Sequence, residues 1–194
     1  MKNPLRETLA TKIAQSLADR IITGVIRPNT PLRQDHIAAE FGASHVPVRE
    51  AFRQLEAQGL AISEPQRGMR VTPFDVEDLH EVAAMRASLE VLALRHAVPN
   101  MTSAVLEAAE QATHAGDVSR EVREWEDANR RFHRLILGPC GMPRLLSAID
   151  TLHTASARFL FAAWRRDWEA RTDHDHRAIL SALRRGHVNL ACEV

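Results

Sequence analysis

The sequence has little of what would place it in a membrane or in a disulfide-stabilised fold. Its 194 residues contain no run approaching the roughly 18 uninterrupted apolar residues that a membrane helix needs. The N-terminus, MKNPLRETLATKIAQ, is amphipathic and contains Glu7, unlike the basic and then apolar order of a signal peptide. Its two cysteines, Cys140 and Cys192, are too few for a disulfide scaffold and lack the paired spacing of a zinc ribbon. We therefore expect a cytoplasmic protein with reduced thiols.

The chain also lacks net charge and has little lysine. Its 25 basic and 25 acidic residues cancel, and all but two of the basic residues are arginine. Residues 1–72 contain 10 Lys or Arg against 7 Asp or Glu, a charge of +3, whereas residues 73–194 contain 15 against 18, a charge of −3. This mild asymmetry favours the N-terminal part as the side that faces a polyanion, although a solvated surface would show the same balance. The length and the 45% apolar content indicate one large or two small globular domains.

The N-terminal part has the pattern of a helix-turn-helix. Apolar residues at helical spacing predict a first helix over about 5–23, and the Pro- and Gly-containing stretch GVIRPNTPLRQ is predicted to be a loop. A short helix is expected over 33–41. A third helix is expected over about 44–59, with Ser44 as its N-cap and Pro47 in its first turn, where the missing N–H has no partner in any case. Two helices joined by a tight turn indicate a helix-turn-helix.

The next stretch, LAISEPQRGMRVTPF, predicts a two-stranded wing around an EPQRG turn. In a helix-turn-helix, the N-terminal end of the second helix enters the DNA major groove. Arg49 near that end and Arg67 at the wing tip are long cations without a role in a core, whereas Arg33 has either a phosphate contact or none. The residues that we expect to contact DNA are Arg33, Ser44, His45, Val46, Pro47, Arg49, Arg53, Gln66, Arg67 and Gly68.

These residues resemble those of a known family. The segment PLRQDHIAAEFGASHVPVREAFRQLEAQGLAISEPQRGMRVTPF is similar to the winged helix-turn-helix of the GntR family of bacterial transcriptional regulators. The similarity extends over about residues 5–72 and implies a DNA-binding domain over residues 1–73. His45 and Val46 stand where family members often have Arg and Thr, so we expect an operator sequence that differs from the commonest one.

From residue 74 onwards the sequence predicts only helices. The expected spans are 76–97, 102–115, 119–137, 142–170 and 173–185. Three stretches, MRASLEVLALRHA, NRRFHRLILGPCGMPRLL and DHRAILSALRRGH, resemble the all-helical FCD effector domain of the FadR-type branch of the same family. The resemblance implies that residues 74–194 form an effector-binding and dimerisation domain. The predicted fold class is therefore mostly α, a winged helix-turn-helix followed by a helical bundle.

The helical part contains a candidate metal site. Asn129 and His133 are four residues apart and project from one face of a helix, and His176 on a later helix can converge on them. Neutral imidazoles with an oxygen donor suit zinc or nickel, and in the resembling family such a set binds a metal that coordinates a carboxylate effector. Asn129 replaces a frequent aspartate, and a last family histidine would lie beyond Val194. Interior hydrogen-bonded histidines are the alternative, and Arg86 binds either an effector carboxylate or Glu90 at i+4.

The pattern favours one function over two others. We expect a DNA-binding transcriptional regulator, commonly a repressor in this family, that acts as a homodimer on a near-palindromic operator and responds to a small carboxylate metabolite. One alternative is an effector-blind regulator with a degenerate ligand domain. The other is a metal-dependent hydrolase or lyase built on Asn129, His133 and His176. The sequence places neither a general base nor a nucleophile beside these three residues, so we predict that the protein is not an enzyme.

Overall fold

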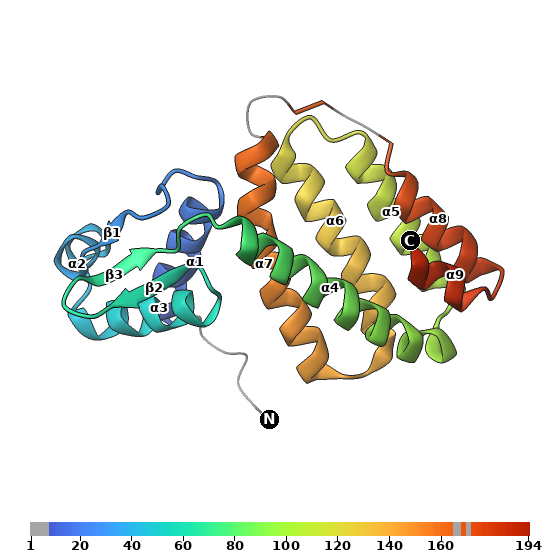
Figure 1. Cartoon of the computed structure of the whole chain (residues 1–194), viewed down its shortest axis with the longest axis horizontal. Helices are drawn as coiled ribbons and strands as arrows, with labels where there is room; N and C mark the ends of the chain where they lie inside the picture. The colour runs from blue at the N-terminus through green and yellow to red at the C-terminus, as the bar shows by residue number, and fades with distance from the viewer. Residues whose placement is uncertain (1–7, 165–167, 170–171) are drawn as a thin grey trace. The chain divides into compact units, whose positions relative to one another are not determined.

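The predicted winged helix-turn-helix is present in the computed structural model, which describes residues 8–164, 168–169 and 172–194. The chain divides into two units. Unit 1 consists of Met1–Leu79 with Thr154–Ala162, and unit 2 of His80–His153 with Ala163–Val194. Each unit has its own hydrophobic core. Figure 1 shows the mostly helical fold that the sequence predicts.

Unit 1 contains the helices α1, α2 and α3 and a small antiparallel sheet, together with the first residues of α4 and a segment of α7. Its sheet has the strand order β1-β3-β2, and β2 and β3 form the wing. The elements are α1 (Leu9–Ile22), β1 (Pro31–Leu32), α2 (Gln34–Phe41), α3 (His45–Ala57), β2 (Ala61–Glu64) and β3 (Gly68–Val71). The core stripe of α1, which includes Leu17, packs with Phe52 and Leu55 of α3 and with Val71 of the wing. This packing fixes α3 on one side and leaves its other side exposed.

Two features of unit 1 differ from the sequence prediction. The stretch predicted as a loop after α1 contains β1, whose Pro31 and Leu32 pair with Arg70 and Met69 of β3. A strand of two residues has no periodicity to detect, and its partners in β3 lie 37 and 39 residues away in sequence. Ser44 is the N-cap residue of α3 as predicted, but its side chain makes no capping hydrogen bond. Its hydroxyl group is therefore not committed to the helix.

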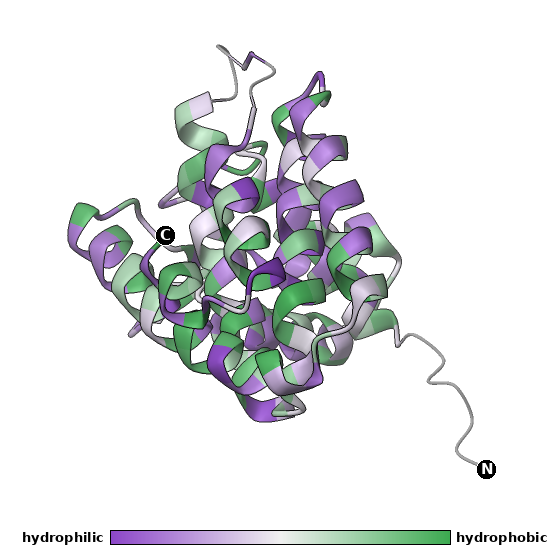
Figure 2. Ribbon diagram, turned by 90° about the vertical axis from the view of Figure 1, so that its right-hand side faces the viewer, coloured by the Kyte–Doolittle hydropathy of each residue, from purple (hydrophilic) through white to green (hydrophobic). Residues whose placement is uncertain are grey.

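Unit 2 is a bundle of helices around a second core. Its elements are α4 (Val76–Ala97, whose first residues belong to unit 1), α5 (Ser103–Asp117), α6 (Val122–Leu137), α7 (Pro143–Trp164, shared with unit 1), α8 (His174–Arg184) and α9 (Val188–Glu193). Helix α5 packs against α6 and α8. Hydrophobic and hydrophilic segments alternate along the helices, as amphipathic packing requires (Figure 2). None of the described helices is long and apolar enough to cross a membrane.

The largest error in the helix prediction concerns α7. The described part of this helix ends at Trp164, and residues 168–169 are not helical, so the expected continuation is wrong at these two positions. Residues 165–167 and 170 of the predicted span lie outside the described residues. The two tryptophans therefore do not form a helical i,i+4 pair. Instead, the indole N–H of Trp168 donates to the carbonyl of Ser119 at 3.2 Å, and its ring lies 5.6 Å from that of Trp125. Tertiary contacts thus decide the position of Trp168, and these are not visible in a local pattern.

Candidate functional site

The exposed side of α3 presents the predicted DNA-reading residues of unit 1. His45, Val46 and Pro47 form its first turn, and Arg49 follows as an exposed side chain. Arg49 has no hydrogen bond or ion pair within the described part of the chain, whereas Arg53 pairs with Glu50 at 2.9 Å. The imidazole of His45 lies 3.4 Å from Asp35 of α2. Arg49 is consequently the cation at this end of α3 that is available to a ligand.

The tip of the wing is a tight turn between β2 and β3. Gln66 and Gly68 both have positive φ, of 65° and 78°, and the N–H of Arg67 donates to the carbonyl of Glu64 at 3.1 Å. A residue with a Cβ would strain the backbone at Gly68, so glycine is favoured at this position of the turn. The guanidinium of Arg67 lies 3.8 Å from the Glu64 carboxylate but is 75% exposed. Such a loose, solvated pair leaves Arg67 able to reach a phosphate.

Replacing Arg67 by alanine is expected to weaken DNA binding to all sequences alike. If Arg67 neutralises one phosphate, the slope of log affinity against log salt concentration should become shallower by about 1. Fluorescence anisotropy titrations at several salt concentrations measure this slope. The matched control is Gln66→Ala, which removes an uncharged neighbour at the wing tip and should leave the slope unchanged. An unchanged slope for Arg67→Ala would mean that Arg67 does not meet phosphate.

Unit 2 contains a cavity of about 480 Å³. The predicted metal-binding residues Asn129, His133 and His176 all line it, so the structure brings these three side chains to one space. The other lining residues are Ala87, Glu90, Val91, Leu94, Trp125, Ile136, Leu137, Asp173, Asp175, Ile179, Ala191, Cys192, Glu193 and Val194. The described lining contains four carboxylates and no lysine or arginine. The cavity therefore favours a cation, or a ligand that brings one with it.

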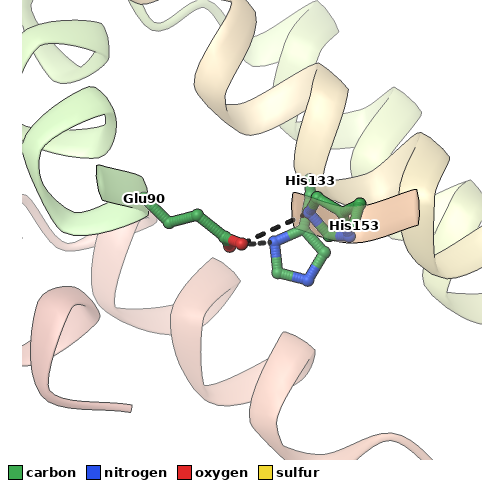
Figure 3. A group of neighbouring side chains, drawn as sticks. All are labelled: Glu90, His133 and His153. Carbon is green, nitrogen blue, oxygen red and sulfur yellow. Dashed lines mark ion pairs between the residues drawn. The ribbon is translucent and has the colours of Figure 1, made fainter. Parts of the chain in front are cut away.

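Glu90 of α4 joins two histidines beside this cavity (Figure 3). One carboxylate oxygen lies 2.8 Å from Nδ1 of His133, and the other lies 3.3 Å from Nε2 of His153 on α7. Arg86 closes the cluster, because its Nε donates to Glu90 at 2.9 Å and one terminal nitrogen lies 3.4 Å from Nε2 of His153. The sequence predicts that Arg86 binds either an effector carboxylate or Glu90, and the structure contains the pair with Glu90.

This network determines the ionisation of Glu90 and His153. Burial alone would raise the pKa of Glu90, but hydrogen bonds from His133 and His153, with the positive charge of Arg86, hold it well below its usual range. Burial lowers the pKa of His153, although its hydrogen bond to Glu90 acts in the opposite direction. Glu90 is therefore a carboxylate at neutral pH, and His153 favours the neutral imidazole.

His176 of α8 is the other histidine that lines the cavity, and it is buried. Its Nδ1 lies 3.2 Å from the carboxylate of Asp173, which also caps α8 by accepting the backbone N–H of His176 at 2.9 Å. Its ring stacks on Phe132, with ring centroids 3.7 Å apart. Burial lowers the pKa of His176 to about 4, against the opposing effect of Asp173. The imidazole is therefore neutral near pH 7, as a metal ligand must be.

Two sets of residues are available for a divalent metal, and they differ in fit. Glu90, His133 and His153 place three ligand atoms within 4.8 Å of one another, but the Glu90 carboxylate is already paired with both imidazoles and with the Arg86 cation. In the set Asn129, His133 and His176, each imidazole keeps Nδ1 on a carboxylate and leaves Nε2 available. A carboxylate behind the imidazole is the usual support of a metal-binding histidine. The second set therefore fits a metal better.

Glu126 of α6 is a buried acid next to the candidate ligands. Burial raises its pKa, and the hydrogen bond from Asn129 at 3.2 Å only partly opposes this. Because the pKa of Glu126 is higher in the folded than in the unfolded state, its protonated carboxyl group stabilises the fold below about pH 4.5. This contribution is lost as pH rises through the folded pKa. Glu126→Gln should therefore raise the melting temperature of metal-free protein at pH 7.5 but not at pH 4. Equal changes at both pH values in thermal unfolding would contradict this.

Sequence reasoning missed three residues of this site. Glu90 was considered only as a partner of Arg86, and nothing in the spacing of His153 points to His133, twenty residues before it. The position of Asp173 could have been predicted, because an aspartate at the start of a predicted helix is a typical N-cap, and its side chain accepts the N–H three residues later. The tertiary packing of α4, α6 and α7 brings the first two together, and local periodicity does not contain that information.

A winged helix-turn-helix followed by a helical unit with a cavity defines a class of protein, the DNA-binding regulators that carry their own ligand-binding domain. The comparison with known families agrees. Residues 9–71 match the bacterial regulatory proteins of the gntR family, and residues 81–194 match the FCD domain. The chain therefore belongs to the GntR family and is a DNA-binding transcriptional regulator with an FCD domain. The predicted family and function are confirmed, and its relatives are regulators rather than enzymes.

Similar proteins extend over nearly the whole chain. A probable D-xylose utilization operon transcriptional repressor of Paenarthrobacter nicotinovorans is 32% identical, over 98% of this chain and 85% of its own length. The crystal structure of a GntR family regulator from Pseudomonas syringae pv. tomato is 31% identical, with a TM-score of 0.57 over 99% of this chain and 81% of the other. Escherichia coli McbR/YncC has a TM-score of 0.77 at 21% identity over 96% and 91% of the two chains, a likeness of fold alone.

Proposed function

We propose that this regulator is a cytoplasmic homodimeric repressor whose DNA binding is controlled by a small molecule in the cavity of unit 2. Two copies of α3 would read the two halves of a near-palindromic operator. Repression is supported by the names of similar proteins, among them the Paenarthrobacter repressor. The observation that carries the effector part is the cavity itself, which brings Asn129, His133 and His176 together although they lie on two helices.

The ligand of the cavity is a small carboxylate held through a divalent metal, zinc or nickel. The support is chemical: the four carboxylates of the described lining repel an anion, and this lining contains no lysine or arginine. A metal on Asn129, His133 and His176 would supply open coordination positions and positive charge for a carboxylate. The residues of the chain keep their own roles, because Glu90 and Asp173 hold the two imidazoles in place through Nδ1.

A second candidate effector is an uncharged sugar. The lack of lysine and arginine in the described lining also favours a sugar, since a sugar hydrogen-bonds to carboxylates and histidines without charge repulsion. The name of the Paenarthrobacter relative, a D-xylose utilization operon repressor, also supports it. In this case the histidines serve as hydrogen-bonding groups of the cavity and no metal is needed.

The test uses a duplex selected from a random-sequence library by the full chain. Its affinity is measured by anisotropy with metal-free and with zinc-loaded protein, each with a panel of short carboxylic acids and with D-xylose. We expect one or more acids to weaken binding by about 5- to 150-fold only when zinc is present. A shift by D-xylose in metal-free protein would favour the sugar instead. No shift with any compound would support the effector-blind regulator.

A further inference from the structure

Arg158 of α7 is an almost completely buried cation within unit 1. Arg158 is 2% exposed, and the three backbone carbonyls that it binds lie 85 to 99 residues before it in the sequence. Residues Thr154–Ala162 belong to unit 1 by their contacts, although the FCD domain match includes them. The structure of the DNA-binding unit is thus completed by a segment from the far end of the chain, and Arg158 is the charged residue of that segment.

The guanidinium of Arg158 binds three backbone carbonyls. One terminal nitrogen donates to the carbonyl of Gly59 at 3.1 Å, and the other donates to the carbonyls of Thr72 and Pro73, both at 3.0 Å. Gly59 follows Gln58, the C-cap of α3, and a cation near this end of the helix also interacts favourably with the helix dipole. Thr72 directly follows β3, the second strand of the wing. Arg158 therefore bridges the end of α3, which carries Arg49, and the base of the wing, which carries Arg67 at its tip.

Aromatic rings enclose the same guanidinium. Its central carbon lies 5.3 Å from the ring centroid of Phe74 and 5.6 Å from that of Phe159, and the two rings lie 5.3 Å apart. Within the described residues no carboxylate forms an ion pair with Arg158, and Asp78 acts on it only at longer range. A buried guanidinium held by carbonyls and rings has strict directional requirements, which a lysine would not reproduce.

The ends of α3 and β3 also bond to each other. The hydroxyl of Thr72 donates to the carbonyl of Gly59 at 2.8 Å, and the N–H of Thr72 donates to the carbonyl of Leu60 at 3.1 Å. The Gly59 carbonyl therefore accepts from both Thr72 and Arg158. This junction is the point from which the wing projects, so its geometry sets the orientation of the wing relative to α3.

We propose that Arg158 is a positioning residue for DNA recognition, which fixes the recognition helix α3 and the wing in the relative orientation that a specific operator requires. It does not touch DNA. Nonspecific binding depends on exposed cations such as Arg67 and tolerates small changes of orientation, whereas base reading by Arg49 does not. Loss of Arg158 therefore reduces the specificity ratio more than it reduces general affinity for DNA.

The experiment compares full-length Arg158→Met with wild type on two duplexes, one selected from a random library by the wild-type protein and one with the same composition in scrambled order. We expect affinity for the selected duplex to fall by about tenfold or more, and affinity for the scrambled duplex to stay within about twofold. Hydrogen exchange of the backbone amides at 60–72 should become faster. Arg144→Met, at an exposed position near the other end of α7, is the matched control and should match wild type in all three measurements.

Arg158→Lys is a second variant, which tests the proposal if Arg158→Met does not fold. It keeps the charge and the apolar stem but cannot bind three carbonyls at once, so it should remain folded and still lose specificity. Circular dichroism and thermal unfolding establish the folded fraction of each variant. The proposal is overturned if a folded Arg158 variant keeps its affinity for the selected duplex within twofold. It is equally overturned if both duplexes lose affinity to the same extent, which is the result of a purely structural role.

Discussion

Arg49→Ala is expected to weaken binding to the selected operator by about 1 to 3 kcal/mol, which is about 5- to 150-fold. Arg49 lies near the N-terminal end of α3, it is exposed, and within the described residues no carboxylate neutralises it. Arg53, one turn further along the same helix, is already paired with Glu50. A bidentate contact from Arg49 to a guanine edge accounts for the expected size, and the loss should be largest at one position of the operator.

The measurement is an anisotropy titration of wild type and Arg49→Ala with the selected duplex and with single-base variants of it. Arg95→Ala, at an exposed position of α4, is the matched control for the loss of one surface charge and should bind normally. The stability of Arg49→Ala should change by less than about 0.5 kcal/mol, because the side chain is exposed. If the variant binds the operator as tightly as wild type, Arg49 does not read a base.

His176→Gln is expected to lower the affinity for zinc or nickel by at least about 100-fold, while His153→Gln should retain it within about tenfold. These two variants separate the two candidate ligand sets, since His133 belongs to both. His176 lines the cavity and supplies a ligand nitrogen, whereas His153 supports Glu90 at 3.3 Å from outside the lining. The larger loss should therefore follow His176.

Competition with a chromophoric chelator measures both affinities, and elemental analysis gives the stoichiometry. His114→Gln, at an exposed position of α5, controls for the removal of any one histidine. The opposite ranking, with metal lost in His153→Gln and kept in His176→Gln, would assign the metal to Glu90, His133 and His153. No stoichiometric metal in the wild type would leave the histidines as hydrogen-bonding groups of the interior.

Much of the fold follows from patterns of short range. The span predicted for α4, residues 76–97, is the observed one. The alternating stretches LAIS (60–63) and MRVT (69–72) predict the wing strands, and each is displaced by one residue from β2 or β3. Such elements are decided by hydrophobic periodicity and by turn residues next to them in sequence. By contrast, β1 exists only through its pairing with β3, and α9 is too short to show a periodic stripe.

The site was predictable to the extent that it depends on one helix. Asn129 and His133 share a face of α6 because they are four residues apart, and a later histidine, His176, does line the same cavity. The metal itself stays a prediction. The Glu90 partner of His133 and the role of Arg158 depend on packing between elements many tens of residues apart, and a single sequence does not encode such pairs in any local spacing.

The division of α7 between the two units limits how this regulator can be recombined with its relatives. A chimaera that joins residues 1–79 to a foreign ligand-binding domain would leave behind the segment 154–162 that completes the DNA-binding unit. The transplanted module would lose the donor for the carbonyls of Gly59, Thr72 and Pro73. Biosensors built by exchanging domains in this protein should therefore carry both segments, because the module boundary is defined in space and not at a single peptide bond.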